Sequence, residues 1–327
     1  MSRPVSTSRT EVVRHLDATV VREVFDLVSA ATDADGVRPL NEHVMLHLRY
    51  GGDADVRHVL RYDGDVLMGY GHLDVTDPVE GSSAEMVVHP GRRKAGHGRA
   101  VVSALVEASP DGRLRLWAHG EHPGAQRLAE GMGFVRLRVL WQMRRSLYAP
   151  LPEPVLPEGV TIRTFRPGED DEEWVALNAS AFASHPEQGQ LSLDDLRTRM
   201  REPWFDPAGF FLAHRGQAMV GFHWTKVHGG NGTDGQPADT HRHGHEPVGE
   251  VYVVGVDPAA QGHGLGRALT LVGLRHLRGV GLPLAMLYVE ADNAPAIRVY
   301  ESLGFTHWDT DVMYRFGPLR PGGPTRA

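Results

Sequence analysis

The chain carries one pattern twice, and this duplication constrains its fold more than any other feature of the sequence. Residues 86–99 read MVVHPGRRKAGHGR, and residues 254–267 read VGVDPAAQGHGLGR. A second pair follows in the same order: residues 125–134 read AQRLAEGMGF, and residues 296–305 read AIRVYESLGF. The offsets are about 168 and about 171 residues, so order and spacing are both kept. Two matching pairs in register indicate a duplication and predict two domains of one fold.

Each half has the same expected order of elements. An amphipathic helix near the start is followed by a hairpin and then by a strand. A glycine-rich turn after this strand opens a second helix. A further strand, a short helix ending at Gly-Phe and a final strand complete each half. This order predicts a mixed α+β sheet with helices on its faces. The expected helices are 16–30, 98–108, 172–184 and 265–277; the turns are 63–65 and 215–217; the strands are 85–88, 114–118, 136–145, 250–256, 284–289 and 311–316.

The length and one proline-rich segment place the domain boundaries. A chain of 327 residues is long for a single core and suits two domains of about 150 residues each. Residues 148–159 read YAPLPEPVLPEG, and four prolines in that stretch exclude a helix or a central strand. We therefore expect domains at 1–149 and 159–317, a linker at 150–158 and a loose tail at 318–327.

Composition excludes several classes of site and partner. The chain has no Cys, so it has no disulfide, thiolate metal site or cysteine nucleophile. A formal charge of -7 argues against nucleic acid as a partner. No apolar run reaches the roughly 18–20 residues of a membrane helix, and the polar start is unlike a secretory signal. A cytoplasmic protein without a membrane partner is expected, and a monomer, because an internal duplication can replace a dimer.

The turn at residues 256–267 carries the strongest chemical indication. Its glycines let backbone amides approach a ligand, and the helix that follows presents free N–H groups, so a pyrophosphate fits there without any lysine. No Gly-Lys-Ser/Thr follows, so it is not a Walker A loop. By itself this pattern also suits a plain tight turn.

Together, residues 261–266 (QGHGLG) and 292–305 (DNAPAIRVYESLGF) resemble the two signatures of the GCN5-related N-acetyltransferases. The resemblance implies acetyl-CoA lying against a splayed central strand, with its pyrophosphate on the glycine-rich turn and no metal. The cofactor-binding residues that it implies in the second half are Val254, Gly255, Val256, Gln261, Gly262, His263, Gly264, Leu265, Gly266, Arg267, Asn293, Ala294, Pro295, Ala296, Ile297 and Arg298.

The first half keeps the turn but diverges where chemistry is expected. In register, Glu250 aligns with Ser82, Tyr300 with Ala129, and Asn293 with His122. We therefore expect the first domain to bind acyl-CoA without catalysis; the alternative is that it only keeps the fold as a packing partner. Its expected cofactor-binding residues are Met86, Val87, Val88, Lys94, Ala95, Gly96, His97, Gly98 and Arg99.

A narrower resemblance covers nearly the whole chain. Residues 39–42 (PLNE), 185–189 (HPEQG), 224–226 (WTK) and 249–258 (GEVYVVGVDP) look like the mycothiol synthase branch of that family. This resemblance implies that the second domain acetylates a small aminothiol glycoside, the cysteinyl amine of desacetylmycothiol. The substrate-binding residues that it implies are Glu42, Glu187, Lys226, Glu250 and Tyr288.

Two side chains suit the proton transfers of such a reaction. An α-amino group has an ordinary pKa of about 7.7–8.0, so a single carboxylate suffices as general base, and we assign that role to Glu250. The leaving group is a thiolate, and the phenol of Tyr300 is the proposed general acid. Without the resemblance, Glu250 reads as a solvated strand end and Tyr300 as a core residue.

Other functions stay open at this stage. The acceptor amine of an aminoglycoside or a protein N-terminus is one alternative, and a non-catalytic acyl-CoA sensor is another. His241, His243 and His245 in the polar loop 228–246 invite a metal interpretation. The loop lacks a rigid frame, so we expect no functional metal there.

Overall fold

The computed structural model describes residues 8–51, 55–76, 81–183, 186–228 and 247–317. The expected tail 318–327 and the loop residues His241, His243 and His245 lie outside these ranges. The chain divides into two compact units. Unit 1 comprises Met1–Leu140 and Asp309–Ala327, and unit 2 comprises Trp141–Trp308.

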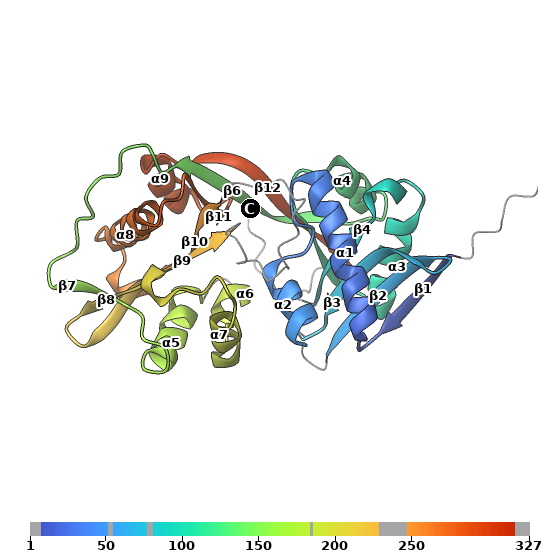
Figure 1. The fold of residues 1–327 in the computed structure, drawn as a ribbon, viewed down its shortest axis with the longest axis horizontal. Helices are drawn as coiled ribbons and strands as arrows, with labels where there is room; N and C mark the ends of the chain where they lie inside the picture. The colour runs from blue at the N-terminus through green and yellow to red at the C-terminus, as the bar shows by residue number, and fades with distance from the viewer. Residues whose placement is uncertain (1–7, 52–54, 77–80, 184–185, 229–246, 318–327) are drawn as a thin grey trace, which may run out of the picture. The chain divides into compact units, whose positions relative to one another are not determined.

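In unit 1 the strands run in the order β1-β2-β3-β4-β5-β12 (Figure 1). Strands β1 to β4 pair antiparallel, β4 and β5 pair parallel, and β12 pairs antiparallel with β5. The strands are β1 (Ser8–Val13), β2 (Val56–Asp63), β3 (Val66–Asp74), β4 (Ser82–Val88), β5 (Leu114–Ala118) and β12 (Thr306–Phe316); the helices are α1 (Ala18–Asp35), α2 (Glu42–Tyr50), α3 (His97–Ala108) and α4 (Pro123–Glu130).

Unit 2 repeats this plan with the order β6-β11-β10-β9-β8-β7. Its central strands β10 and β11 pair parallel, while β10-β9, β9-β8 and β8-β7 pair antiparallel. The strands are β6 (Val135–Ser146), β7 (Val160–Thr164), β8 (Phe210–Arg215), β9 (Ala218–His228), β10 (Val248–Val256) and β11 (Leu284–Glu290); the helices are α5 (Asp171–Ala181), α6 (Pro186–Gly189), α7 (Leu193–Met200), α8 (Leu265–Gly279) and α9 (Ala294–Ser302).

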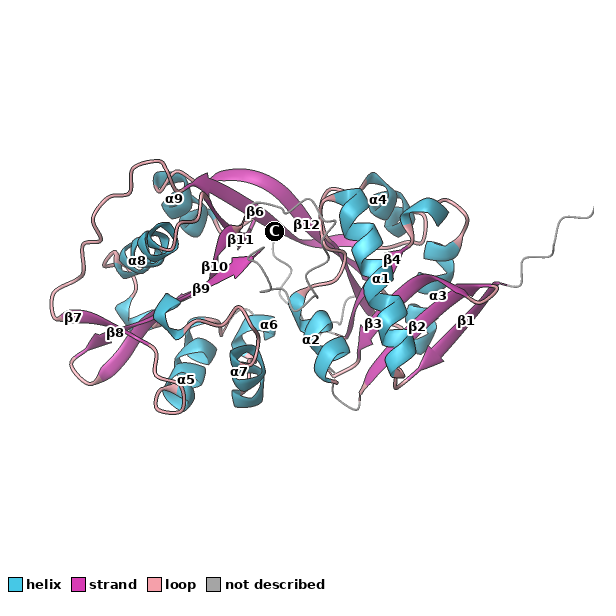
Figure 2. Cartoon of the chain, in the orientation of Figure 1, coloured by secondary structure: helices cyan, strands magenta, loops and turns pink. Residues whose placement is uncertain are grey.

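Helices cover both faces of each sheet. In unit 1, α1 buries Val24 and Leu27 on one face, and α3 buries Val101 and Leu105 on the other. Figure 2 shows the same division in unit 2, with α5 and α7 on one side of the strands and α8 and α9 on the other. The predicted mixed α+β sheet is therefore confirmed. None of the helices in the described part of the chain has the length and apolarity that crossing a membrane requires.

The compact units differ from the contiguous domains 1–149 and 159–317 that the sequence predicts. Strand β12 follows the second half in sequence, yet Val312 to Phe316 pair with Ala118 to Leu114 of β5 in unit 1. Strand β6 belongs to the first half, but from Trp141 onwards it lies in unit 2 beside β11. The two halves have thus exchanged their final strands. Residues 150–158 connect β6 to β7 without helix or strand.

The ends of the helices follow local rules, except at the two glycine turns. Asp17 caps α1 by accepting hydrogen bonds from the backbone N–H groups of Thr19 and Val20. By contrast, α3 begins after Gly96 and α8 after Gly264, both with positive φ (89° and 79°) and without a side-chain cap. The first amide groups of these two helices are therefore not used by a capping side chain.

An aromatic cluster supports the strands of unit 2. Trp224 of β9 stacks on Phe210 of β8 at 4.6 Å between ring centres, and Trp174 of α5 meets Trp224 edge-on at 5.7 Å. Trp224 also meets Tyr252 of β10 edge-on at 5.2 Å. Buried aromatic pairs of this kind contribute about 0.5–1.5 kcal/mol each beyond the area that they bury. The cluster holds β9 and β10 in place, and these strands carry Lys226 and Glu250.

Candidate functional site

The parallel strands β10 and β11 separate partway along their length. Their pairing runs from Val248–Leu284 to Glu250–Met286 and ends there, while β10 continues to Val256. In unit 1, the pairing of β4 with β5 likewise ends at Ala84 and Leu116. Beyond each fork, the backbone of the longer strand does not pair with its parallel neighbour and can receive an extended ligand.

Glu250 lies at the fork of unit 2. Val251 packs among the leucines of α8, so the alternation of a strand directs Glu250 to the opposite face. The carboxylate is 9% exposed, and its Oε2 lies 2.6 Å from Nε2 of His228, the last residue of β9. Lys226 is the cross-strand neighbour of Glu250. The fork therefore carries a nearly buried carboxylate with an imidazole partner.

A β-bulge in β10 shows that the alignment of Glu250 with Ser82, predicted from the sequence, is wrong by one residue. The pairing of β10 with β9 shifts by one residue between Val251 and Val253, whereas β4 pairs with β3 without interruption. Counting back from the glycine turns through this bulge, the residue of β4 that matches Glu250 is Ser83 and not Ser82. Both are serines, so unit 1 still lacks a carboxylate at this position.

Lys226 is held by aromatic rings. Its ammonium lies 4.4 Å from the ring centre of Trp204 and 5.4 Å from that of Tyr252, and the residue is 6% exposed. The hydroxyl of Tyr252 accepts a hydrogen bond of 2.9 Å from Nε of Arg199. Cation–π contacts of a desolvated ammonium are worth about 2 kcal/mol. The rings thus fix the position of a cation on the strand next to Glu250.

The remaining substrate residues predicted from the sequence lie in several elements. The hydroxyl of Tyr288 on β11 accepts a hydrogen bond of 2.8 Å from Nε2 of Gln142 on β6. Glu42 is the first residue of α2, and Glu187 belongs to α6. Glu250, Lys226 and Tyr288 lie on β10, β9 and β11 of unit 2, whereas Glu42 lies in unit 1.

Tyr300 lies on α9, within the second signature of unit 2. Its ring meets Phe305 at 5.9 Å between ring centres, and burial raises the pKa of the phenol to about 12. The hydroxyl therefore keeps its proton throughout the neutral range. Such a group is a hydrogen-bond donor and a weaker acid than a thiol, whose ordinary pKa is about 8.5.

The glycine turn of unit 2 is exposed and shaped by its backbone. Gly262 and Gly264 have φ of 84° and 79°, and a Cβ at either would meet nothing within 4 Å, so conformation alone requires glycine. Arg267 donates a hydrogen bond of 2.7 Å to Oγ of Ser302, which joins α8 to α9. Asn293 caps α9 by accepting from the N–H of Ala296. The two signatures are therefore neighbours.

Some predicted cofactor residues have packing roles for their side chains. Leu265 and Ile297 are buried in hydrophobic clusters, which leaves only their backbone groups for a ligand. Gly255 is required by space, because a Cβ there would lie 2.6 Å from the ring of Phe222. Val254 and Val256 are half-buried on the face of α8.

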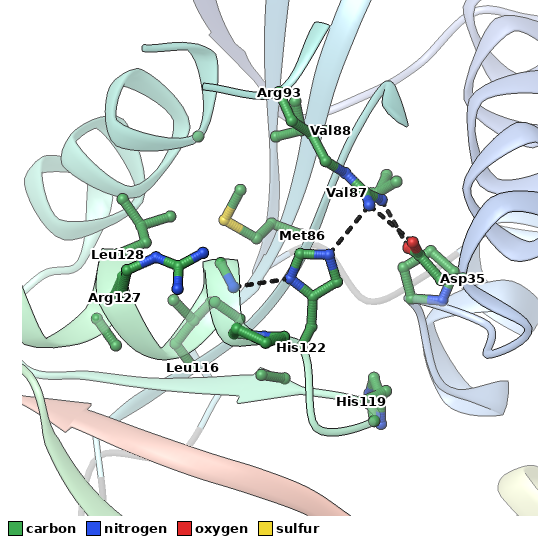
Figure 3. Close-up of a pocket in the computed structure, with 18 of the residues that line it drawn as sticks. Asp35, Met86, Val87, Val88, Arg93, Leu116, His119, His122, Arg127 and Leu128 are labelled. Carbon is green, nitrogen blue, oxygen red and sulfur yellow. Dashed lines mark hydrogen bonds and ion pairs between the residues drawn. The ribbon is translucent and has the colours of Figure 1, made fainter. Parts of the chain in front are cut away.

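Unit 1 contains a cavity of about 640 Å³ between its fork and α4 (Figure 3). The cavity is lined by Met86, Val87 and Val88 of β4, which were predicted from the sequence, and by residues of α4, which were not. The glycine turn contributes Lys94, Gly96, Gly98 and Arg99. The other two predicted residues, Ala95 and His97, do not line it; His97 is buried and accepts a hydrogen bond of 3.4 Å from Nε of Arg61.

At one side of this cavity, Arg93 is clamped between two elements. Its guanidinium donates to both carboxylate oxygens of Asp35, at 2.7 and 2.6 Å, and lies 3.1 Å from Nε2 of His122 (Figure 3). Nδ1 of His122 in turn caps α4 by accepting from the N–H of Gly124. His122 thus has the capping role that Asn293 has in unit 2. The sequence did not indicate the contact with Asp35.

A buried charged cluster adjoins the cavity of unit 1. His119 lies between Glu85 (Nε2 to Oε1, 3.3 Å) and Asp311 (Nδ1 to Oδ2, 2.9 Å). Burial opposes the charged imidazole, but Glu85 and then Asp311 outweigh burial and raise the pKa of His119 to about 10. Asn41 donates its backbone N–H to Glu85, and Gly120 donates its own to Asp311. His119 is therefore a fixed cation at neutral pH.

Sequence reasoning missed the groups that depend on tertiary contacts. These are His228, Arg199, Trp204 and Tyr252 of unit 2 and the charged cluster of unit 1. Of these residues, only Tyr252 could have been predicted from the sequence, because it lies two residues after Glu250 on the same expected strand. Across the described ranges, no group of three or more histidine, aspartate or glutamate side chains has an arrangement that would hold a metal ion.

Comparisons with known proteins place this geometry in a family. The model of the acetyltransferase (GNAT) family matches residues 23–134 and 174–305, which confirms the tandem arrangement. The mycothiol acetyltransferase of Streptosporangium roseum is 56% identical, over 94% of this chain and 99% of its own. That of Acidothermus cellulolyticus is 58% identical, over 97% of each chain.

Solved structures share the fold at lower identity. A tandem GNAT protein from the clavulanic acid biosynthesis pathway superposes with a TM-score of 0.70 at 20% identity, over 96% of this chain and all of its own. A GCN5-related N-acetyltransferase from Sphaerobacter thermophilus gives a TM-score of 0.66 at 24% identity, over 94% of this chain and 95% of its own.

Proposed function

The chain belongs to the acetyltransferase (GNAT) family and is an N-acetyltransferase, and from this premise we propose that it acetylates the cysteinyl amine of desacetylmycothiol. The products are mycothiol and CoA. The observation that carries the proposal is the fork of unit 2, where Glu250 stands at the point where β10 and β11 separate. The similarity to mycothiol acetyltransferases, which extends over nearly the whole chain, supports the choice of acceptor.

Acetyl-CoA is the proposed donor, held in unit 2 by the fork and the glycine turn. The backbone of Val254 and Val256 receives the pantetheine arm, and the amides from Gln261 to Arg267 receive the pyrophosphate. The absence of a side-chain cap on α8 supports this assignment, because its first amides stay available. Asn293 to Arg298 line the opposite side.

The reaction is a direct transfer. Glu250 takes a proton from the ammonium of the acceptor, the amine nitrogen forms a bond to the thioester carbon, and the carbon–sulfur bond breaks. The nitrogen loses its remaining excess proton to solvent as the amide forms. CoA leaves as a thiolate, and Tyr300, expected from the sequence to act as general acid, is proposed instead to donate a hydrogen bond to its sulfur. Because the pKa of Tyr300 is about 12, the phenol stabilises the thiolate and remains the less acidic partner.

The acceptor is recognised by groups around Glu250. The fixed ammonium of Lys226 suits the hydroxyl oxygens of a sugar or inositol, because an ammonium only donates. Tyr288 is 41% exposed, and its hydroxyl is proposed to contact the acceptor. Glu187 of unit 2 is proposed to accept a hydrogen bond from the same acceptor, and the role of Glu42 stays a prediction from the sequence.

Unit 1 is proposed to hold acyl-CoA without transferring the acyl group. The cavity next to its fork and glycine turn supports binding. Ser83 stands where unit 2 has Glu250, so that position of unit 1 offers no carboxylate to accept the proton of an amine.

One experiment tests the proposed activity. The purified chain is incubated with acetyl-CoA and desacetylmycothiol, and mass spectrometry follows the acceptor while a thiol-independent assay follows CoA. The expected result is one added acetyl group on the cysteinyl nitrogen and an equal amount of CoA. An aminoglycoside and the glucosaminyl-inositol without cysteine serve as control acceptors. Faster acetylation of either control would overturn the proposed acceptor.

A further inference from the structure

The imidazole of His228 is the one side-chain partner that the described residues provide to the carboxylate of Glu250. Nε2 lies 2.6 Å from Oε2, a distance typical of a charge-assisted hydrogen bond. His228 is the last residue of β9, and Glu250 lies near the start of β10. The side chain of Glu250 is 9% exposed, whereas that of His228 is 26% exposed. The imidazole thus extends from a nearly buried carboxylate towards solvent.

This arrangement meets a need that a buried general base creates. Once Glu250 has taken a proton from the acceptor amine, its carboxyl group must lose that proton before the next turnover. A buried carboxyl exchanges slowly with bulk water unless a group connects it to the surface. An imidazole suits this task because it accepts at one nitrogen and releases at the other.

We propose that His228 is a positioning and proton-relay residue that orients Glu250 and carries its proton to solvent. This inference rests on the proposed function, in which Glu250 is the base. The ring starts as the tautomer that carries its hydrogen on Nδ1. Nε2 of His228 accepts the proton from Oε2 of Glu250, and Nδ1 gives its own proton to water. The carboxylate is thereby regenerated, and the ring returns to its starting tautomer by exchange with solvent. No bond other than O–H and N–H changes, and no co-reactant is consumed.

The other polar groups on these strands cannot replace His228. Lys226 lies directly across from Glu250, but an ammonium has no lone pair and cannot receive a proton. Tyr252 and Arg199 are hydrogen-bonded to each other through the phenol oxygen and Nε. His228 therefore combines the contact, the exposure and the chemistry of a relay.

The test compares wild type with His228→Ala and His228→Gln in steady-state assays on desacetylmycothiol at low buffer concentration. We expect kcat to fall about 10- to 100-fold in both variants, less than the roughly 10²–10⁴-fold effect of a general base, with KM for acetyl-CoA unchanged. Added imidazole should restore the kcat of His228→Ala towards wild type, because a soluble imidazole takes up the relay. His214→Ala on β8 is the matched control and should show neither loss nor rescue.

The outcomes separate the relay from the proposed function. Two results overturn the relay alone. One is a wild-type kcat in His228→Ala. The other is a loss of kcat that added imidazole does not restore, with calorimetry showing unchanged binding of CoA. If His228→Ala does not bind CoA, the more conservative His228→Gln takes its place in the comparison with wild type, and the same two results overturn the relay. A wild-type chain that does not acetylate desacetylmycothiol overturns the proposed function instead.

Discussion

Asp311, close to the end of the chain, accepts a hydrogen bond of 2.9 Å from Nδ1 of His119, which lies 192 residues earlier in the sequence. The contact fastens β12 to the end of β5, within unit 1. On its other side, the imidazole faces Glu85 of β4. A single buried cation thus joins three strands, one of which comes from the far end of the sequence.

This cluster predicts a specific pH dependence of stability. The pKa of His119 is about 10 in the folded chain, above its ordinary value of 6.5, so the folded state binds the extra proton. The stabilisation is fully present below pH 6.5 and is lost as the pH rises through 10, at about 1.4 kcal/mol per pH unit between these limits. Urea unfolding of wild type and His119→Gln across that range should show a difference in unfolding free energy that shrinks with rising pH.

Asp309→Asn is the control for the cluster, since Asp309 accepts from the backbone of Glu121 and does not contact the imidazole. Its unfolding free energy should follow the wild-type pH dependence. A difference between wild type and His119→Gln that stays constant from pH 6 to pH 10 would refute the charged state of His119.

Replacing Glu250 by Gln should lower kcat by about 10²–10⁴-fold, because the amide keeps the shape but cannot take the proton of the ammonium. Binding of acetyl-CoA should be unchanged by calorimetry. Glu301→Gln, an exposed change on α9, is the matched control and should leave kcat at the wild-type value. Equal kcat in wild type and Glu250→Gln would remove Glu250 from the mechanism.

Tyr300→Phe should lower kcat by about 10- to 100-fold, since the thiolate loses a hydrogen-bond donor. The packing against Phe305 is retained, so the melting temperature should stay the same. Because the pKa of the phenol is about 12, the pH profile of kcat between 7 and 9 should have the same shape in variant and wild type. A basic limb that disappears in Tyr300→Phe would show that the phenol titrates in that range.

The two glycine turns predict two CoA sites per chain. A Cβ at Gly264 or Gly96 would meet no atom within 4 Å, but the positive φ strains a valine there by about 1–3 kcal/mol. We expect calorimetry to give two sites in wild type and one in each variant. Only Gly264→Val should lose turnover. Loss of turnover in Gly96→Val with unit 2 still binding CoA would contradict a non-catalytic unit 1.

Lys226→Gln should raise KM for the acceptor and leave KM for acetyl-CoA unchanged, because the ammonium held by Trp204 and Tyr252 is proposed to contact the acceptor and not the cofactor. Steady-state titration of each substrate separates the two constants. Lys94→Gln in the turn of unit 1 is the control, and its acceptor KM should equal that of wild type. An unchanged acceptor KM in Lys226→Gln would assign Lys226 a purely structural role.

Much of the architecture was predictable because it depends on local pattern. Strand 114–118 is found as predicted, and the helix predicted at 265–277 is observed as Leu265–Gly279. The hairpin turns and glycine turns also stand where glycine and alternating apolar residues placed them. Helices α2 and α7 and strands β1 and β7 were not predicted, because these short elements carry too few residues for a clear period.

The sequence by itself determined the duplication, the two glycine turns and the presence of Glu250 at a central-strand position where the other copy has a serine. Only the tertiary structure decided which unit each final strand joins and which side chains meet, as His119 meets Asp311, His228 meets Glu250 and Lys226 meets Trp204. The physical reason is that a strand pairs through backbone groups, which are the same in both copies. Equivalent strands of a duplicated chain can therefore exchange, and every side-chain contact that follows from the exchange depends on the assembled sheet.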